Sequence, residues 1–319
     1  MKIRVGIVGY GNLGKAVEQT ILADQKLKLV AIFSRRLVKS RYNTKVEQYD
    51  QILDYKSKID IMLLCGSSKT DLEYQTPELL KHFDVINTFD THAKITKFYK
   101  TTNNISTSFN HRAIICCGWD PGIFSVIRGL LLSIGKNKPI TFWGRGISMG
   151  HSDAVRNVHH VDDGIEFTVP IKSAVQKAKH FELEKGEPLH ERICFVCAND
   201  KHQKQIERDI KSIPNYFKGQ PTKINFISRE KVMKLKQKMY HKGLIIQSFK
   251  TCSGSNCKLE FSLSIKSNPD FTACVMVTYL KAIINLKKEK KVGAFTPLDI
   301  PISYLFDSNK KLSLLSSIC

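Results

Sequence analysis

Residues 3–14, with the sequence IRVGIVGYGNLG, decide how the rest of the chain is interpreted. Six residues typical of a buried strand lead into the glycine pattern G-x-G-x-x-G, and a helical pattern follows. In such a loop the first glycine permits a tight turn, the second lets a pyrophosphate approach the backbone, and the third lets the helix pack close to the sheet. The stretch therefore predicts a dinucleotide site at a helix N-terminus, where N–H groups and the helix dipole favour an anion.

The length of the chain and its patterns predict two domains. A chain of 319 residues is typical of about two domains. Strand and helix patterns alternate after the glycine loop, which predicts a Rossmann-type α/β domain with a doubly wound parallel sheet over residues 1–120.

The second half of the chain has a different rhythm. Period-2 alternation predicts strands in an α+β domain over residues 121–268, with a mixed or antiparallel sheet, for substrate binding and dimerisation. A glycine-rich loop near residue 150 is followed by a predicted helix from Ala154. Another predicted helix begins at Asn268 and has Phe271, Cys274, Val275 and Thr278 at core spacing. We expect this helix and the tail, residues 269–319, to return to the first domain.

The end of the second predicted strand, residues 27–33, indicates which dinucleotide is bound. An NAD enzyme usually places an acidic residue there to hold the ribose hydroxyls. This chain has Ser34, Arg35 and Arg36 instead. A hydroxyl and two guanidinium groups bind a 2′-phosphate through charge-assisted hydrogen bonds, whereas a carboxylate repels it. We predict NADP as the cofactor; the alternative is a pair of exposed arginines with no ligand.

Polar clusters follow three further predicted strands, at the sheet edge where ligands bind in open α/β sheets. Asp90 follows one of these strands, and Asp120 lies in the segment GWDPG that follows another. We predict that both carboxylates lie near the nicotinamide; the alternative is that each caps a following helix. The predicted cofactor-binding residues are Gly9, Tyr10, Gly11, Asn12, Leu13, Gly14, Ser34, Arg35, Arg36, Ser67, Ser68, Thr70, Asp71, Thr91, His92, Ala93, Asp120, Pro121 and Gly122.

Composition argues against several other classes of protein. The net charge of +21 raises nucleic acid as a partner, but the positive charge is spread along the chain, so we interpret it as a solvated surface. No apolar run is long enough to cross a bilayer, and Lys2 and Arg4 lead straight into a strand pattern rather than a signal peptide. Nine cysteines fit a reducing compartment, and their spacing predicts no metal site. We therefore expect a cytoplasmic protein without a membrane partner.

Several segments together resemble one family, the meso-diaminopimelate D-dehydrogenases. The resemblance rests on the glycine loop, on residues 33–36 (FSRR), and on more specific segments after residue 118, and it extends from residue 2 to about residue 306. The specific segments are GWDPG at 118–122, FWG at 142–144, GHSDA at 150–154, NPDFTA at 268–273 and GAFT at 293–296.

The resemblance implies a homodimeric NADP enzyme of lysine and peptidoglycan precursor synthesis. Such an enzyme oxidises the D-centre of meso-2,6-diaminopimelate to an imine, which water hydrolyses to the 6-oxo acid and ammonia. It also implies that Asp90, Trp119 and Asp120 flank the reacting centre, where a carboxylate can act as base or direct water. By the same resemblance the substrate-binding residues are Trp119, Asp120, Trp143, Met149, Asp153, Thr168, Arg192, His241 and Asn268, with Thr168, Arg192 and His241 on the distal carboxylate.

One departure from the family pattern concerns a substrate residue. The family usually has Met-Pro-His-Gly-Gly where this chain has Met239, Tyr240, His241, Lys242 and Gly243. Lys242 stands where the family has a glycine, so this position carries a side chain and a charge and has less backbone freedom. The register of His241 is therefore left open. Two alternatives therefore stay beside the leading hypothesis: an NADP oxidoreductase acting on another D-amino acid or an aldehyde, and a catalytically silent protein that binds NADPH or nucleic acid.

Overall fold

A computed structural model describes residues 2–237, 240–306, 313, 316 and 317. The chain divides into two compact units. Unit 1 comprises residues 1–126 and 269–319, and unit 2 comprises residues 127–268. The predicted boundary was at residue 120, and the observed one falls within helix α4 (Ile123–Ile134), which passes from one unit into the other.

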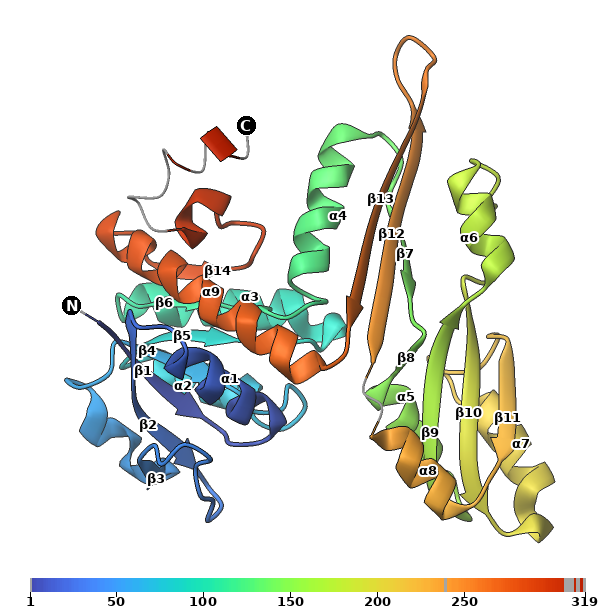
Figure 1. The fold of residues 1–319 in the computed structure, drawn as a ribbon, viewed down its shortest axis with the longest axis horizontal. Helices are drawn as coiled ribbons and strands as arrows, with labels where there is room; N and C mark the ends of the chain where they lie inside the picture. The colour runs from blue at the N-terminus through green and yellow to red at the C-terminus, as the bar shows by residue number, and fades with distance from the viewer. Residues whose placement is uncertain (1, 238–239, 307–312, 314–315, 318–319) are drawn as a thin grey trace. The chain divides into compact units, whose positions relative to one another are not determined.

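Unit 1 is built on a parallel sheet that has seven strands in the described part of the chain (Figure 1). Every strand pairing within this sheet is parallel, because each crossover contains a helix or a long loop. The strands in spatial order are β14 (Gly293–Phe295), β6 (Arg112–Ile114), β5 (Asp84–Asn87), β4 (Ile61–Leu64), β1 (Ile3–Val8), β2 (Leu27–Ser34) and β3 (Val46–Gln48).

Helices cover both faces of this sheet, because its central strands are apolar on both sides. One core cluster joins the sheet to α1 (Asn12–Leu22) and α9 (Asn268–Lys288). The other joins it to the 3₁₀ helix η1 (Tyr49–Tyr55) and to α2 (Leu72–Leu80) and α3 (Ile95–Ser108). This arrangement confirms the predicted doubly wound Rossmann-type fold. Two further 3₁₀ helices are η2 (His92–Lys94) and η4 (Ile302–Leu305).

The return of the chain to unit 1 is made by α9 and β14. Helix α9 packs its buried residues on the sheet, and β14 adds a parallel edge strand beside β6. The sequence pattern placed this helix correctly but assigned part of its core wrongly, since Cys274 and Thr278 are exposed. A helix covered from more than one side does not show a single apolar stripe. The tail positions 307–312, 314, 315, 318 and 319 lie outside the described residues.

Unit 2 has two sheets in its described part. The larger, in the order β11-β10-β9-β8, is mixed, because β11 is parallel to β10 whereas the other pairs are antiparallel. The smaller, in the order β13-β12-β7, is antiparallel, and Figure 1 shows β12 and β13 as a long hairpin. The strands are β7 (Ile140–Trp143), β8 (Gly146–Ile147), β9 (Val161–Pro170), β10 (His190–Ala198), β11 (Thr222–Phe226), β12 (His241–Lys250) and β13 (Asn256–Ile265).

Short helices complete three separate cores in unit 2. Helices α5 (Met149–Arg156) and α7 (Gln203–Ser212) pack on one face of the mixed sheet, and α8 (Arg229–Lys236) packs on the other. Helix α6 (Lys172–Lys179) covers the smaller sheet, and η3 (Asp200–His202) precedes α7. The prediction that a helix starts at Ala154 is wrong. Helix α5 begins at Met149, because the Ser148 hydroxyl caps it by accepting a hydrogen bond from the backbone N–H of His151 at 3.4 Å.

Candidate active site

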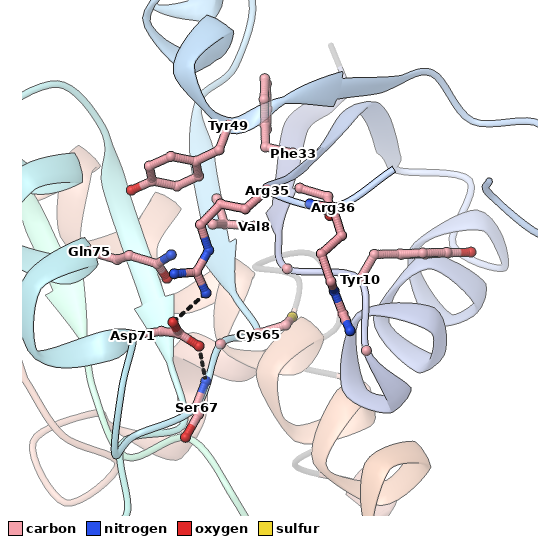
Figure 2. Close-up of a pocket in the computed structure, with 14 residues that line it drawn as sticks. Val8, Tyr10, Phe33, Arg35, Arg36, Tyr49, Cys65, Ser67, Asp71 and Gln75 are labelled. Atoms are coloured by element: carbon pink, nitrogen blue, oxygen red, sulfur yellow. Dashed lines mark hydrogen bonds and ion pairs between the residues drawn. The ribbon is translucent and has the colours of Figure 1, made fainter. Parts of the chain in front are cut away.

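A pocket of about 460 Å³ lies in unit 1 beside the carboxyl ends of β1, β2 and β4 (Figure 2). Parallel sheets bind ligands at this edge, because the loops that leave the strands meet there. The predicted cofactor residues that line it are Gly9, Tyr10, Gly11, Ser34, Arg35, Arg36, Ser67 and Asp71. Sequence reasoning did not identify Tyr49, Cys65 and Gln75, which also line it.

The glycine loop has the geometry that its sequence predicts. Gly9 has φ of +91°, which favours glycine. A Cβ at Gly14 would lie 2.1 Å from the carbonyl oxygen of Gly9, so the helix can pack here only without a side chain. A Cβ at Gly11 would meet no atom within 4 Å. Packing therefore does not require glycine at position 11, and the absence of a side chain leaves open space beside the N-terminus of α1.

A buried glutamate fixes the loop that follows β2. Glu18 of α1 is fully buried and accepts a hydrogen bond from the hydroxyl of Tyr10, in the glycine loop. It also accepts one from Ser40 Oγ at 2.5 Å, and the backbone N–H of Arg41 donates to the Tyr10 hydroxyl at 2.9 Å. These bonds tie residues 40 and 41 to the glycine loop, and so order the segment that carries Arg35 and Arg36. The sequence offered no signal for this role beyond an acidic residue in an otherwise apolar helix face.

The two predicted phosphate-binding arginines leave the end of β2 on different paths (Figure 2). Arg35 reaches Asp71, with 2.5 Å between its Nη2 and the Asp71 Oδ1, whereas Arg36 extends toward Tyr10. Asp71 Oδ2 accepts the backbone N–H of Ser67 at 2.9 Å. Burial favours the neutral acid, but these two donors more than compensate and lower the pKa of Asp71. The pocket thus holds a carboxylate whose charge is already matched by Arg35.

Other predicted cofactor residues lie at the same sheet edge but outside the lining of this pocket. They are distributed over α1 and the segments that follow β4, β5 and β6. These residues are Asn12, Leu13, Gly14, Ser68, Thr70, Thr91, His92, Ala93, Asp120, Pro121 and Gly122.

The two predicted catalytic carboxylates follow neighbouring strands of unit 1. Asp90 is exposed beyond β5, and its backbone N–H donates to Ser68 Oγ at 3.1 Å. Asp120 lies in a tight turn beyond β6, closed by the bond from the Gly118 N–H to the Pro121 carbonyl at 3.0 Å. Strand β6 ends at residue 114, and Cys116 beyond it adopts φ of +61°, which a strand does not allow.

The turn around Asp120 also places an aromatic ring. Trp119 packs edge-on against Phe124 with ring centroids 5.3 Å apart. Gly122 has φ of +141°, and a Cβ there would lie 1.8 Å from the Gly118 carbonyl oxygen, so the turn requires glycine. Two carboxylates and an indole are therefore held at one edge of the unit 1 sheet.

Unit 2 contains a buried polar cluster formed by Glu166, Thr168 and Arg192. Thr168 on β9 lies directly opposite Arg192 on β10, and Glu166 lies two residues earlier on the same face. Arg192 Nη1 donates to Thr168 Oγ1 at 2.6 Å, and Thr168 Oγ1 donates to Glu166 Oε1 at 3.1 Å. The Arg192 Nη1 to Glu166 Oε1 distance is 3.7 Å. Arg192 Nε is buried and has no hydrogen-bond partner among the described residues.

Burial shifts the protonation of this cluster and its neighbours. It raises the pKa of Glu166 to about 7, against the opposing effects of Arg192 and Thr168. It lowers the pKa of His151 and of His190 to about 4 each, and the positive charge of Arg192 adds to both shifts. Near neutral pH the two imidazoles are therefore uncharged. Sequence reasoning missed Glu166, although its i,i+2 spacing from Thr168 on a predicted strand was a usable signal.

The other predicted substrate residues are also in unit 2. Trp143 is half exposed, its ring stacks on His190, and its backbone N–H donates to His190 Nε2 at 2.8 Å. Asp153 pairs with Arg156, and the Met149 side chain is exposed. His241 is the first residue of β12 and pairs with Ile265, which settles its strand register, whereas the neighbouring Met239 lies outside the described residues. Asn268 is the last residue of unit 2.

The predicted catalytic and substrate residues are therefore divided between the two units. Asp90, Trp119 and Asp120 belong to unit 1 with the pocket, and the nine-residue substrate set is otherwise in unit 2. Across the described residues there is no group of three or more histidine, cysteine or acidic side chains that could hold a metal ion. Within the same residues, no helix has the length and apolar character needed to span a bilayer.

Comparison with known proteins gives concordant matches over nearly the whole chain. The family model described as diaminopimelic acid dehydrogenase C-terminal domain matches residues 118–267. A meso-diaminopimelate D-dehydrogenase of Ureibacillus thermosphaericus is 41% identical over 314 residues, which cover 95% of each chain.

Two solved structures are similar over at least 99% of each chain. A meso-diaminopimelate dehydrogenase variant of Clostridium tetani, solved with diaminopimelate, has a TM-score of 0.92, 40% sequence identity and complete coverage of both chains. An engineered D-amino acid dehydrogenase bound to NADP⁺ has a TM-score of 0.86 and 33% identity, with 99% of each chain covered.

Proposed function

This chain belongs to the meso-diaminopimelate D-dehydrogenase family, and we propose from that premise how its own residues carry out the family's reaction with NADP. The reaction is the oxidative deamination of the D-centre of meso-2,6-diaminopimelate, a step of lysine biosynthesis. The substrate loses a hydride from Cα to the cofactor. Water then replaces the nitrogen, which gives L-2-amino-6-oxopimelate, an ammonium ion and a proton. The reverse direction is a reductive amination.

NADP fits the pocket of unit 1 better than NAD does. The open space at Gly11 and the N-terminus of α1 suit a pyrophosphate. At the end of β2 a serine and two arginines replace the acidic residue that would hold a free ribose. The single observation that carries this choice is that Asp71, an acidic residue lining this pocket, is neutralised by Arg35, so a 2′-phosphate would meet net positive charge.

Asp90 and Asp120 would hold the reacting end of the substrate. A bound nicotinamide would supply the hydride acceptor, so the residues beside it would have to hold the substrate Cα against it. Two carboxylates at the ends of β5 and β6 can bind the ammonium group and keep it oriented. After oxidation one of them can take a proton from the water that attacks the imine. Trp119, fixed against Phe124, would limit the space beside the reacting carbon.

Arg192 and Thr168 would bind the distal carboxylate. Arg192 presents a buried Nε donor that has no acceptor among the described residues, and a carboxylate supplies that acceptor. Trp143, Met149, Asp153, His241 and Asn268 would shape the rest of the pocket. Recognition of the L-end by unit 2 would then select which end of the molecule is oxidised.

We also propose a homodimer, located in the cytoplasm. Helix α4 exposes three large aliphatic side chains, namely Leu130, Leu132 and Ile134, each more than half exposed. Leu130 and Ile134 are one turn apart on the same face of α4, and exposed aliphatic side chains on one helix face support a surface covered by a partner.

A spectrophotometric assay of cofactor reduction tests the proposed function. We expect NADP⁺ to be reduced with meso-diaminopimelate and not with the LL isomer, which has no D-centre. The DD isomer has a D-centre but lacks the L-end, so its turnover should be poor. Reduction of NAD⁺ at the same rate would contradict the cofactor assignment.

A second candidate function is a broader D-amino acid dehydrogenase. Two observations support this candidate: the similarity to the engineered D-amino acid dehydrogenase and the unusual residues beside His241. In that case the DD isomer and short D-amino acids would be oxidised as efficiently as the meso isomer.

A further inference from the structure

The cofactor pocket contains a buried amide with no internal partner. Gln75 lies on α2 with only 3% of its surface exposed, and its Oε1 has no hydrogen-bond partner in the described part of the chain. A buried acceptor left without a donor destabilises a protein, and such groups are rare in native structures. Because Gln75 also lines the pocket, a donor on a bound ligand is a direct explanation for its position.

The surrounding residues leave the oxygen of this amide without a donor. Asp71, at the N-cap of α2 one turn earlier, already accepts hydrogen bonds from Arg35 and from the N–H of Ser67, so neither donor is available to Gln75. A Cβ at Gly66 would lie 3.0 Å from Gln75 Oε1, so a glycine at this position avoids crowding the amide. The side chain thus lines the pocket beside a carboxylate that already accepts from two donors.

Flat groups flank the amide. Figure 2 shows the Gln75 side chain next to the Arg35 guanidinium group, with the Tyr49 ring nearby on the same side of the pocket. Guanidinium and phenol groups stack on planar heterocycles. A glutamine amide pairs in the plane of adenine, accepting from the N6 amino group and donating to N7. Planar side chains and an amide that line one pocket are the groups that recognise a purine carrying an amino group.

We propose that Gln75 recognises the adenine of NADP by accepting a hydrogen bond from its N6 amino group. This inference rests on the proposed binding of NADP in the same pocket. It adds a specificity-determining residue on α2 to the glycine loop and the arginines. The arginines would select the 2′-phosphate, and Gln75 would select the base.

Binding measurements can test this inference without turnover. Isothermal titration calorimetry would compare NADP⁺ with its hypoxanthine analogue, in which a carbonyl oxygen replaces the amino group. The N6 and N7 edge of the analogue presents two acceptors, so the wild-type protein should bind NADP⁺ about tenfold more tightly. Gln75→Leu should lower NADP⁺ affinity by a similar factor and abolish the preference. Gln75→Glu, which offers acceptors only, should retain a preference for NADP⁺.

Two controls separate a binding role from a structural one. Gln75→Leu removes an unpartnered acceptor, so the melting temperature of the ligand-free protein should not fall. Gln19→Leu, at an exposed position on α1, should leave both affinities unchanged. If wild-type protein binds NADP⁺ and the analogue equally, the assignment of Gln75 is wrong while NADP binding stands. If NADP⁺ does not bind at all, the proposed cofactor is wrong instead.

Discussion

The cofactor pocket of unit 1 and the polar cluster of unit 2 meet charge in opposite ways. The Arg35 side chain is 57% exposed, so it stays hydrated when no ligand is bound. Glu166 is fully buried and the Arg192 side chain is only 16% exposed. The first site leaves its arginine partly in water, whereas in the second both the acid and the arginine are desolvated. Preorganised buried groups interact more strongly with a ligand. They also make the stability of the unit sensitive to pH and to the removal of one member of the buried ion pair.

The largest effect that would test this contrast is expected from Arg192→Ala. Loss of a two-point contact to the distal carboxylate should reduce kcat/KM for meso-diaminopimelate by roughly 2–4 kcal/mol, mainly through KM. D-Alanine has no distal carboxylate, so its slow oxidation should hardly change. Steady-state kinetics on both substrates would measure this difference.

Asp120→Asn is the matched variant for unit 1. It should depress kcat chiefly and leave cofactor binding intact, since asparagine keeps the size of the side chain but removes the charge and the proton acceptor. If Arg192→Ala instead reduces kcat/KM equally for meso-diaminopimelate and D-alanine, Arg192 has a structural role or lies near the reacting atoms.

The next effect concerns the glycines of the cofactor loop. Gly14→Ala would place a Cβ 2.1 Å from the Gly9 carbonyl oxygen, so we expect the free energy of unfolding to fall by about 1–3 kcal/mol, together with loss of NADP⁺ binding. Gly11→Ala meets no atom within 4 Å, so its stability should match wild type while its NADP⁺ affinity still falls. Thermal denaturation with and without NADP⁺ separates the two. Two variants with the same stability loss would remove the distinction between packing and ligand approach.

The smallest effect is a change in the pH dependence of stability. The folded-state pKa of Glu166 is about 7, above its ordinary value of 4.5, so its contribution is fully present below pH 4.5 and is lost as the pH rises through 7. His151 and His190 oppose it, because their lowered pKa values make stability rise between pH 4 and 6.5.

Glu166→Gln should therefore make the free energy of unfolding rise more steeply with pH below pH 6.5. Near pH 7 it should increase that free energy by about 1–2 kcal/mol, because the loss caused by Glu166 ionisation is removed. Urea denaturation at a series of pH values would measure both changes. Gln cannot titrate but keeps the size of the side chain, so it is a conservative test. An unchanged profile would mean that Glu166 is solvated in the folded protein.

The sequence predicts the cofactor site better than the substrate site, for a physical reason. Gly9, Gly11 and Gly14 lie within six residues of one another, and the strand and helix around them are local, so pattern alone specifies their geometry. Arg192 and Thr168, by contrast, become neighbours only through the pairing of β9 with β10. That pairing depends on register, which alternation does not determine. The resemblance to a family, rather than the pattern, named those two residues.

Other features could not be predicted because they depend on burial. Glu18 and Gln75 are ordinary polar helix residues in sequence, and their burial beside the pocket is a consequence of packing. The end of β6 depends on the positive φ of Cys116, a residue with no special preference for that conformation. The mixed character of the larger unit 2 sheet was left open by period-2 alternation, since β11 pairs in parallel with β10 by a crossover.

The position of α9 and β14 after unit 2 has a consequence for protein synthesis. Residues 1–126 leave the ribosome without the helix that covers much of one sheet face, and without the edge strand beside β6. Unit 2 is continuous along the chain and can finish folding first. At the usual 5–20 residues per second, α9 is synthesised roughly 7–30 s after residue 126, and the sheet is incomplete during that time. During that interval the apolar sheet face that α9 later covers is a surface to which a nascent-chain chaperone can bind. Slow translation of unit 2 would prolong its exposure.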